Sequence, residues 1–394
     1  MKITVPTIDF GTSKIVTMVA QSNGERCDIV GSGAVPYSGY LQDGWNNPDE
    51  IRDVIRTAID QAQKTGNCRI HELNVGVPGM FTRVIVKEVH VSLTGSDPHV
   101  TAQDVRACFK LAEESGGDRI IHSAPAWFRV DDGKKTLSPV GIKGRELSAM
   151  IALVTADKYF IDDITYRLRD MDIEPREFYS TVAGEATYAL SQDERDKTAM
   201  LIDIGYLCTD VMVMEGDALI FHKCLDIGGG HISADIAEQL NIPFPFVEEK
   251  IKQTYSFNST NQDETYVIPA TEDEPARTVR RDEVTPIIEA KVEEIAEAIN
   301  KALEEGGVKL GKWSNVYLTG GGLILNKGGK DFLAGKLHRI IREAQRTNNK
   351  MTSHVFSSAV GLTILVVTTQ EEQKAPEGGA KGLFSRAFRW LMGY

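Results

Sequence analysis

The stretch Asp9-Phe10-Gly11-Thr12-Ser13-Lys14 decides the fold class of this 394-residue chain. Apolar, strand-like segments flank it at 3–8 and 15–20, so the sequence predicts a strand, a tight turn and a returning strand. Pro6 fits the first strand poorly, because proline lacks the N–H that a strand donates. The turn combines a glycine, hydroxyls, a lysine and a carboxylate, which are groups that handle phosphate and hydrated Mg²⁺. Taken alone, it is equally well explained as an ordinary hairpin with a charged tip.

The second half of the chain repeats this layout. Apolar residues 199–202 lead into Asp203-Ile204-Gly205, and residues 211–214 predict a returning strand. A two-residue turn at Gly216 and Asp217 then leads to a further strand at 218–222. Two strand-turn-strand segments that each contain Asp-x-Gly indicate duplicated α/β domains that face each other across a cleft.

Two glycine runs complete the set of motifs. Gly228-Gly229-Gly230 follows the second hairpin, and Gly320-Gly321-Gly322 follows an apolar segment at 313–319. Glycines let a nucleotide base lie flat against the backbone, although each run also suits the start of a helix built from small residues. The joint order of two acidic hairpins and two glycine runs favours a nucleotide cleft.

The composition excludes several classes of protein. A formal net charge of −12 argues against a dedicated nucleic-acid-binding protein, whose phosphate contacts need a basic surface. The five cysteines are scattered without a CxxC pair, so the sequence predicts neither a disulfide framework nor a zinc site and favours a reducing cytoplasm. The N-terminus lacks a signal-peptide layout, and no apolar run approaches the ~20 residues that span a bilayer. We therefore expect a soluble body.

Three further stretches place these motifs in a known order. The chain reads TVAGEA at 181–186, LTGGG at 318–322 and SSAVGL at 357–362. Together with the hairpins they resemble the phosphate-1, connect-1, phosphate-2, adenosine and connect-2 motifs of the actin/Hsp70/hexokinase superfamily. Within that superfamily, residues 9–14 and the stretch 120–144, which ends in PVGIKG, resemble the FtsA family of bacterial cell-division proteins. The resemblance covers nearly the whole chain.

The resemblance implies an α/β, two-lobed actin-like (ribonuclease H-like) fold that binds ATP and Mg²⁺. Asp9 and Asp203 are the expected catalytic and metal-binding carboxylates. Glu249 and Lys252 match a ribose-contacting pair on a helix before a variable hairpin, and a solvated helix face explains them nearly as well. The expected nucleotide-binding residues are Gly11, Thr12, Ser13, Lys14, Gly205, Gly229, Glu249, Lys252, Gly320, Gly321 and Gly322.

One departure from the family's pattern concerns hydrolysis. The phosphate-2 motif of the family is Asp-x-Gly-Gly-Gly-Thr-x-Asp, whereas this chain has Tyr206-Leu207-Cys208-Thr209 after Gly205. Leu207 places a branched side chain where a glycine lets the backbone approach the terminal phosphates. We expect ATP to bind and its hydrolysis to be slow or absent, unless a shifted loop compensates.

The resemblance also divides the chain into subdomains. Subdomain 1A would comprise 1–81 and 157–180, with the FtsA-type insertion, subdomain 1C, at 82–156. Subdomain 2A would comprise 181–226 and 307–368, and subdomain 2B residues 227–306. The polar stretch 369–382 indicates a flexible linker, and 383–394 predicts a C-terminal amphipathic helix.

The expected C-terminal helix has the composition of a membrane anchor. Apolar and aromatic residues occupy one broad face, and two arginines lie opposite, as in helices that lie in the headgroup layer. The residues are Leu383, Phe384, Phe388, Trp390 and Leu391, with Arg386 and Arg389 on the polar face. A helix that folds back onto the protein's own core is the alternative.

The resemblance implies a set of partners and a location. Arg281 and Lys291 match positions of the subdomain that binds the acidic C-terminal tail of the tubulin-like protein FtsZ, although a solvated charged face explains them as well. A member of this family would form head-to-tail filaments on inner-membrane lipids at the division septum, tether FtsZ and recruit downstream division proteins. Nucleic acid is not an expected partner. A PilM-like membrane adaptor and a sugar or acetate kinase of the same superfamily remain alternatives.

Overall fold

The computed structural model describes residues 3–24, 26–41, 44–117, 119–261, 263–270, 275–311, 314–344 and 353–373. Their contacts divide them into two compact units. The first contains the described residues up to Met200, residues 212–222 and the last described helix. The second contains Leu201–Val211 and Lys223–Ala344.

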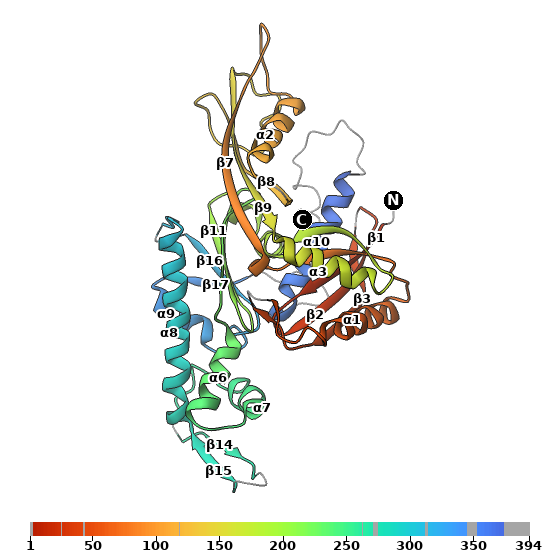
Figure 1. The fold of residues 1–394 in the computed structure, drawn as a ribbon. Coiled ribbons are helices and arrows are strands. Elements are labelled where there is room, and N and C mark those ends of the chain that lie inside the picture. The colour runs from red at the N-terminus through yellow and green to blue at the C-terminus, as the bar shows by residue number, and fades with distance from the viewer. Residues whose placement is uncertain are drawn as a thin grey trace. The chain divides into compact units, whose positions relative to one another are not determined.

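The first unit is built on a mixed five-stranded sheet (Figure 1). In spatial order its strands are β10 (Glu174–Ser180), β6 (Glu72–Val77), β1 (Ile3–Phe10), β2 (Lys14–Ser22) and β3 (Cys27–Pro36). β1 runs antiparallel to β2 and parallel to β6. Its pairing with β6 begins at Thr7, so Pro6 lies outside the paired part of that edge and its missing N–H is tolerated.

Helices cover both faces of this sheet. α1 (Ile51–Gly66) and α3 (Lys158–Arg169) share one hydrophobic core with it, and α10 (Ser357–Gln373) packs on the strands through two other cores. Because side chains alternate along a strand, Ile8 and Phe10 face α1 and α3, whereas Thr7 and Asp9 face α10. The alternation of β1 therefore places a carboxylate inside the protein.

A close helix crossing fixes the position of α10. α4 (Thr181–Ala189) and α10 touch at Gly184 and Gly361. A Cβ atom on Gly361 would lie 2.5 Å from the Cα of Glu185, and one on Gly184 would lie 2.9 Å from the carbonyl oxygen of Gly361. The two backbones can approach this closely only because both positions lack a side chain.

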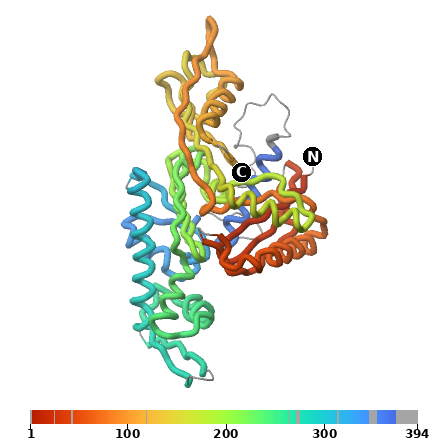
Figure 2. The backbone as a smooth tube through the Cα atoms, viewed as in Figure 1, coloured from red at the N-terminus to blue at the C-terminus, as the bar shows by residue number. Residues whose placement is uncertain are grey.

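Residues 82–156 form a second sheet, with three antiparallel strands in the order β7 (Thr82–Ser92), β9 (Glu146–Ala156) and β8 (Ile120–Val130). α2 (Ala102–Glu114) packs on one face of it, as the orange and yellow part of Figure 2 shows. The N–H of Thr101 donates to Asp104, and the N–H of Asp104 donates to the Thr101 hydroxyl. This capping box explains where α2 begins.

A third sheet, of five strands, continues into the second unit. Its order is β13 (Ala218–Leu225), β12 (Thr209–Glu215), β11 (Ala199–Ile204), β16 (Asn315–Thr319) and β17 (Ile341–Glu343). The second unit also contains α6 (Gly229–Gln239), α7 (Phe244–Phe246), the π-helix η2 (Val247–Lys252), the hairpin β14 (Thr265–Ile268) and β15 (Arg277–Arg280), α8 (Arg281–Glu305) and α9 (Gly329–Leu337). Shorter elements elsewhere are β4 (Tyr40–Leu41), β5 (Gly44–Trp45), η1 (Gly79–Phe81), α5 (Gln192–Arg195) and η3 (His354–Phe356).

Most elements expected from periodicity are confirmed. The strand-turn-strand segments at both Asp-x-Gly motifs are present. α1 and α8 have apolar residues at helical spacing within 51–62 and 284–303, and these residues are buried. Part of the polar stretch 256–278 belongs to a short antiparallel hairpin, in which β14 pairs with β15.

Two expectations about the end of the chain are wrong. Residues 353–368 were expected in subdomain 2A, but α10 packs on the sheet of the first unit, which also contains residues 181–200. The linker was expected at 369–382, but α10 continues through the first part of this range to Gln373. Its polar residues are held by the sheet: Gln370 is buried and donates to Asn74, 3.3 Å away, and Glu371 accepts from Ser22.

The expected membrane helix, residues 383–394, lies outside the described residues, as does the rest of the expected linker from 374 on. Within the described part of the chain, no helix is both long enough and apolar enough to cross a bilayer.

Gly361→Ala tests the crossing of α4 and α10. The added methyl group would overlap the backbone of Glu185, which has no side-chain freedom to move away. We expect a loss of about 1–3 kcal/mol of unfolding free energy, seen as a lower urea midpoint by circular dichroism. Gly335→Ala in α9 is the matched control, since no atom of the residues that the structure describes lies within 4 Å of its Cβ position. Equal midpoints for the two variants would contradict the close crossing.

Candidate functional site

The turn between β1 and β2 is held by hydrogen bonds from its own backbone and from two tyrosines. The N–H of Gly11 donates to the carbonyl of Lys14, 3.1 Å away. The Tyr37 hydroxyl donates to the carbonyl of Gly11 at 2.6 Å, and the Tyr40 hydroxyl donates to that of Phe10 at 2.9 Å. The segment expected to contact phosphate therefore has a fixed backbone.

Asp9 is a buried carboxylate at the end of β1. Its Oδ2 accepts a hydrogen bond from the hydroxyl of Ser358, 2.8 Å away on α10. Its Oδ1 is also buried and accepts no hydrogen bond from the described residues. Burial raises the pKa of Asp9 to about 6, although the Ser358 hydrogen bond and the charge of Lys14 oppose the rise.

This environment fits a hydrated Mg²⁺ ion. A buried carboxylate oxygen without a donor is costly, and a cation or its bound water would compensate it. Lys14 is half-buried, with its Nζ 5.3 Å from the centre of the Phe356 ring. Thr12 is buried and Ser13 half-buried in the same turn. The first hairpin thus brings together all the side chains that the sequence assigned to it.

The second hairpin repeats the backbone pattern of the first. Asp203 is the penultimate residue of β11, as Asp9 is of β1. The N–H of Gly205 donates to the carbonyl of Cys208 at 2.9 Å, the counterpart of the Gly11 to Lys14 bond. The similarity of the two segments in the sequence is therefore also present in the structure. Cys208 occupies the position that corresponds to Lys14.

Both glycine runs bind the second hairpin through their backbones. The N–H of Gly229 donates to the carbonyl of Gly205 at 2.9 Å, and that of Gly230 donates to Tyr206 at 2.7 Å. The N–H of Gly322 donates to Ile204 at 2.7 Å. Gly205, Gly229 and Gly322, expected to bind nucleotide, thus lie together in the second unit, but their own N–H groups are used within the protein.

Gly320 and Gly229 each occupy a place that only glycine fits. Gly320 has a φ of +91°, and a Cβ there would lie 2.1 Å from Oδ1 of Asp203. A Cβ on Gly229 would lie 2.4 Å from the Cα of Gly322. Gly321 continues the same run, and Gly320 is the member of the run that lies against the second aspartate.

The expected ribose-contacting pair, Glu249 and Lys252, lies on the π-helix η2. Lys252 is buried and pairs with Glu248 at 3.0 Å, whereas Glu249 is exposed. The π-helix η2 turns the residue at 248 inward, where it also accepts from Ser233 at 2.7 Å. Burial lowers the pKa of Lys252, and the charge of Glu248 opposes this effect. Helical spacing gave no signal for the π-helix.

Tyr206 has a structural role that the sequence did not predict. A Cβ on Gly230 would lie 3.0 Å from the Tyr206 ring, and Nζ of Lys252 lies 5.8 Å from the centre of that ring. The residue that replaces a family glycine therefore fills the space between α6 and η2. Tyr206 and Glu248 therefore both lie beside Lys252, one of the residues expected to bind nucleotide.

The two expected partner-binding residues are engaged inside the second unit. Arg281 is buried, pairs with Glu264 at 2.9 Å and stacks 4.3 Å from the centre of the Tyr255 ring. These contacts hold the β14–β15 hairpin to the start of α8. Lys291 pairs with Asp235 at 2.9 Å and with Glu294 at 2.6 Å.

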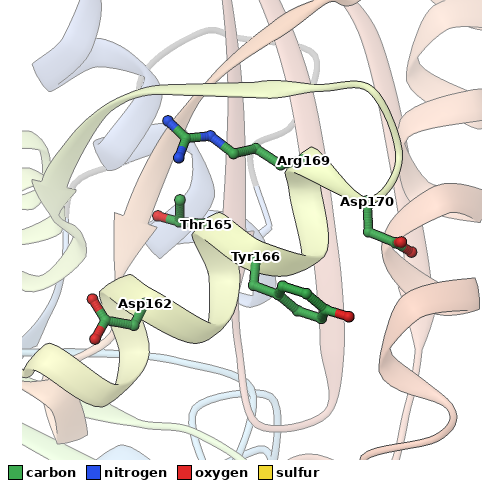
Figure 3. A pocket seen from close by; sticks show the side chains of 5 residues that line it. All are labelled: Asp162, Thr165, Tyr166, Arg169 and Asp170. Atoms are coloured by element: carbon green, nitrogen blue, oxygen red, sulfur yellow. The ribbon is translucent and has the colours of Figure 1, made fainter.

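A surface hollow on α3 is a poor candidate for a ligand site. Figure 3 shows that the five side chains that line it point in different directions along one helix. Asp170 pairs with Arg52 at 2.8 Å, and Arg169 pairs with Glu174 at 2.6 Å. Because these charges are already paired, each hairpin is a better candidate site than this hollow. The lining residues are Asp162, Thr165, Tyr166, Arg169 and Asp170.

Asp9→Asn tests the buried carboxylate. With a folded-state pKa near 6 instead of 3.8, the folded chain binds more protons than the unfolded chain between these values. The contribution of the protonated Asp9 carboxyl group to the unfolding free energy is therefore lost as the pH rises through 6. The variant should gain about 1–2 kcal/mol over the wild type between pH 5 and pH 8, measured by urea unfolding with a chelator present.

Asp49→Asn, at an exposed position, is the control and should follow the wild-type pH profile. A constant difference between Asp9→Asn and the wild type from pH 5 to pH 8 would show that Asp9 is not buried as described.

Two family models match the chain. The model for the cell division protein FtsA matches residues 200–361, and the model for the SHS2 domain inserted in FtsA matches residues 79–155. Together they cover more than half of the sequence. The second match coincides with the sheet β7-β9-β8 and α2.

Relatives and solved structures agree with these matches. The chain is 24% identical to the cell division protein FtsA of Pseudomonas aeruginosa, covering 98% of this chain and 97% of the relative. It is 26% identical to that of Bacillus subtilis, covering 76% and 70%.

Solved structures show the fold. A chain of the PilM-PilN type IV pilus biogenesis complex has a TM-score of 0.60 at 17% identity, covering 93% of this chain and 99% of that chain. MreB5 of Spiroplasma citri bound to ADP has a TM-score of 0.55 at 11% identity, covering 95% and 99%. The fold is therefore that of the actin-like ATPases, with an SHS2 insertion. The chain belongs to the FtsA family of actin-like cell-division proteins.

Proposed function

We propose that this protein binds ATP and Mg²⁺, assembles into filaments on the inner face of the cell membrane and tethers FtsZ there. The proposal rests on the structure of the first hairpin in a chain of the FtsA family. Its backbone is fixed, and it holds Asp9 buried near the charge of Lys14, with one carboxylate oxygen that accepts no hydrogen bond from the described part of the chain. Such a turn is built for a phosphate group and its cation.

Each residue of the hairpin has a defined role in this proposal. Bound Mg²⁺ would neutralise phosphate charge, and Asp9 would hold the ion's water shell. Lys14, with the hydroxyls of Thr12 and Ser13, would donate to phosphate oxygens. Asp203 would serve as a metal-binding carboxylate in the second unit. Tyr206 and Lys252 would border the nucleotide in the second unit, where the family pattern places the ribose.

Hydrolysis would be slow or absent. The turn after Asp203 contains Tyr206 and Leu207 instead of glycines, and three backbone N–H groups bind its carbonyls. A turn fixed in this way is poorly able to rearrange around a terminal phosphate. ATP would therefore act as a switch for assembly more than as a substrate.

Lys14→Ala tests nucleotide binding. Loss of one charge-assisted hydrogen bond, worth about 1.5–3 kcal/mol, should weaken the binding of a fluorescent ATP analogue roughly 10- to 100-fold. Lys64→Ala removes an exposed lysine from the last turn of α1 and should bind like the wild type. Unchanged affinity in a folded Lys14→Ala protein would exclude this hairpin as the phosphate site.

Attachment to the membrane would depend on residues 383–394, which lie outside the described residues. Their aromatic and basic composition supports a helix in the headgroup layer. One short helix of this kind binds reversibly, and the many copies in a filament would bind by avidity. The filament, not the single chain, would then be the unit that stays on the membrane and recruits downstream division proteins.

FtsZ binding would involve the surface around the start of α8. Arg281 would position the β14–β15 hairpin, because its guanidinium is buried against Glu264 and Tyr255. Lys291 and the exposed Arg280 would attract the acidic tail of FtsZ. Both carry carboxylate partners in this structure, so an acidic peptide would have to replace Asp235 or Asp282.

Liposome co-sedimentation tests the membrane and partner proposals together. With ATP and Mg²⁺, the full chain should pellet with anionic liposomes and carry an FtsZ C-terminal peptide, whereas a chain that lacks residues 383–394 should stay in the supernatant. Matched neutral liposomes are the control, since about 1 kcal/mol per basic residue should be lost there.

Pelleting without the FtsZ peptide would favour a PilM-like adaptor that binds another tail. Failure to pellet under any condition would refute the membrane anchor, and a screen for sugar or acetate kinase activity would follow.

A further inference from the structure

Three potential metal ligands meet on the second hairpin. Cys208 directly precedes β12, Asp210 is the second residue of β12, and Cys224 is the penultimate residue of β13, the neighbouring strand. One ligand atom from each residue lies within 4.8 Å of the other two. Cys208 is buried, and Asp210 and Cys224 are half-buried. The sequence predicted no zinc site because these cysteines lack a ligand-like spacing, but strand pairing brings them together.

The geometry and the ligand chemistry suit a zinc ion. Two sulfurs bound to one zinc at about 2.3 Å lie roughly 3.8 Å apart in a tetrahedral site. The three ligand atoms, within 4.8 Å of one another, therefore need to close by only about an ångström. Two thiolates and a carboxylate form a donor set that zinc accepts readily, with water as the fourth ligand.

A divalent cation suits this cluster, because its charge would stabilise two thiolates and a carboxylate at once.

The cluster is coupled to the expected nucleotide site through the backbone. The carbonyl of Cys208 accepts from the N–H of Gly205, and the hydroxyl of Thr209 donates to the carbonyl of Ile227 at 2.7 Å. A Cβ on Gly228 would lie 2.9 Å from the backbone nitrogen of Cys208. An ion held here would therefore tie the base of the hairpin to β13 and to the glycine run before α6.

We propose that Cys208, Asp210 and Cys224 bind one Zn²⁺ ion that clamps the second hairpin. On binding, each thiol loses its proton to water as its sulfur forms a bond to the ion. No oxidation is involved. The site does not depend on the proposed function, because its ligands are separate from the first hairpin and from the expected membrane helix.

Cobalt binding to the reduced, metal-free full chain tests this site. One equivalent of Co²⁺ should produce the near-ultraviolet absorption of thiolate-bound cobalt, and Zn²⁺ should abolish it by displacement. Cys208→Ser and Cys224→Ser should each weaken Zn²⁺ binding at least about tenfold, measured by competition with a chromogenic chelator. Asp210→Asn should retain the thiolate band with a lower affinity.

Cys68→Ser, which changes a half-buried cysteine of the first unit, is the control and should bind like the wild type. The wild-type spectrum decides the question even where a variant fails to fold. Absence of the thiolate band, or the same band in Cys208→Ser and the wild type, would overturn the proposal. A disulfide would also overturn the proposal. It would be seen as a fall from five free thiols to three on mild air oxidation, in the presence of Zn²⁺ as well as in its absence.

Discussion

Direct backbone contact at glycines is the constraint on which the candidate site depends. In the first unit, α10 reaches its place on the sheet only because Gly361 and Gly184 let two helices touch. In that position, Ser358 of α10 donates a hydrogen bond to Asp9, and Thr363 of α10 forms a hydrogen bond with Thr7. The burial that raises the pKa of Asp9 is thus a consequence of a helix crossing elsewhere in the chain.

Close backbone contacts at glycines also occur in the second unit, where they hold the second hairpin. The glycine runs at 228–230 and 320–322 meet the second hairpin backbone to backbone, and their N–H groups satisfy its carbonyls. The sequence assigned these glycines to nucleotide contact. In the structure they also build the support of Asp203, so a substitution there would disturb the protein before any ligand is bound.

Local pattern predicted the elements but not their long-range partners. The hairpins at Asp9 and Asp203, α1 and α8 follow from periodicity, because each buries a face that its own sequence displays. The end of α10 looked like a linker, since Gln370 is polar and only the distant Asn74 makes it a buried residue. The proximity of Cys208 and Cys224 depends on the order of the strands in the sheet, which the spacing of the cysteines does not reveal. The inward orientation of Glu248 depends on a π-helix, which ordinary helical spacing does not predict.

The two hairpins share one backbone frame and differ in what their turns are able to do. In the first, two tyrosine hydroxyls and one backbone hydrogen bond hold the turn, and Lys14 and Asp9 are the side chains proposed to contact phosphate and its cation. In the second, Cys208 replaces the lysine position, Tyr206 fills the space beside Lys252, and three N–H groups bind the carbonyls. Moving the second turn would break several of these bonds at once, each worth about 0.5–1.5 kcal/mol. Such a frame is better suited to respond to a bound nucleotide than to follow its cleavage, which supports the switch function that we propose for ATP.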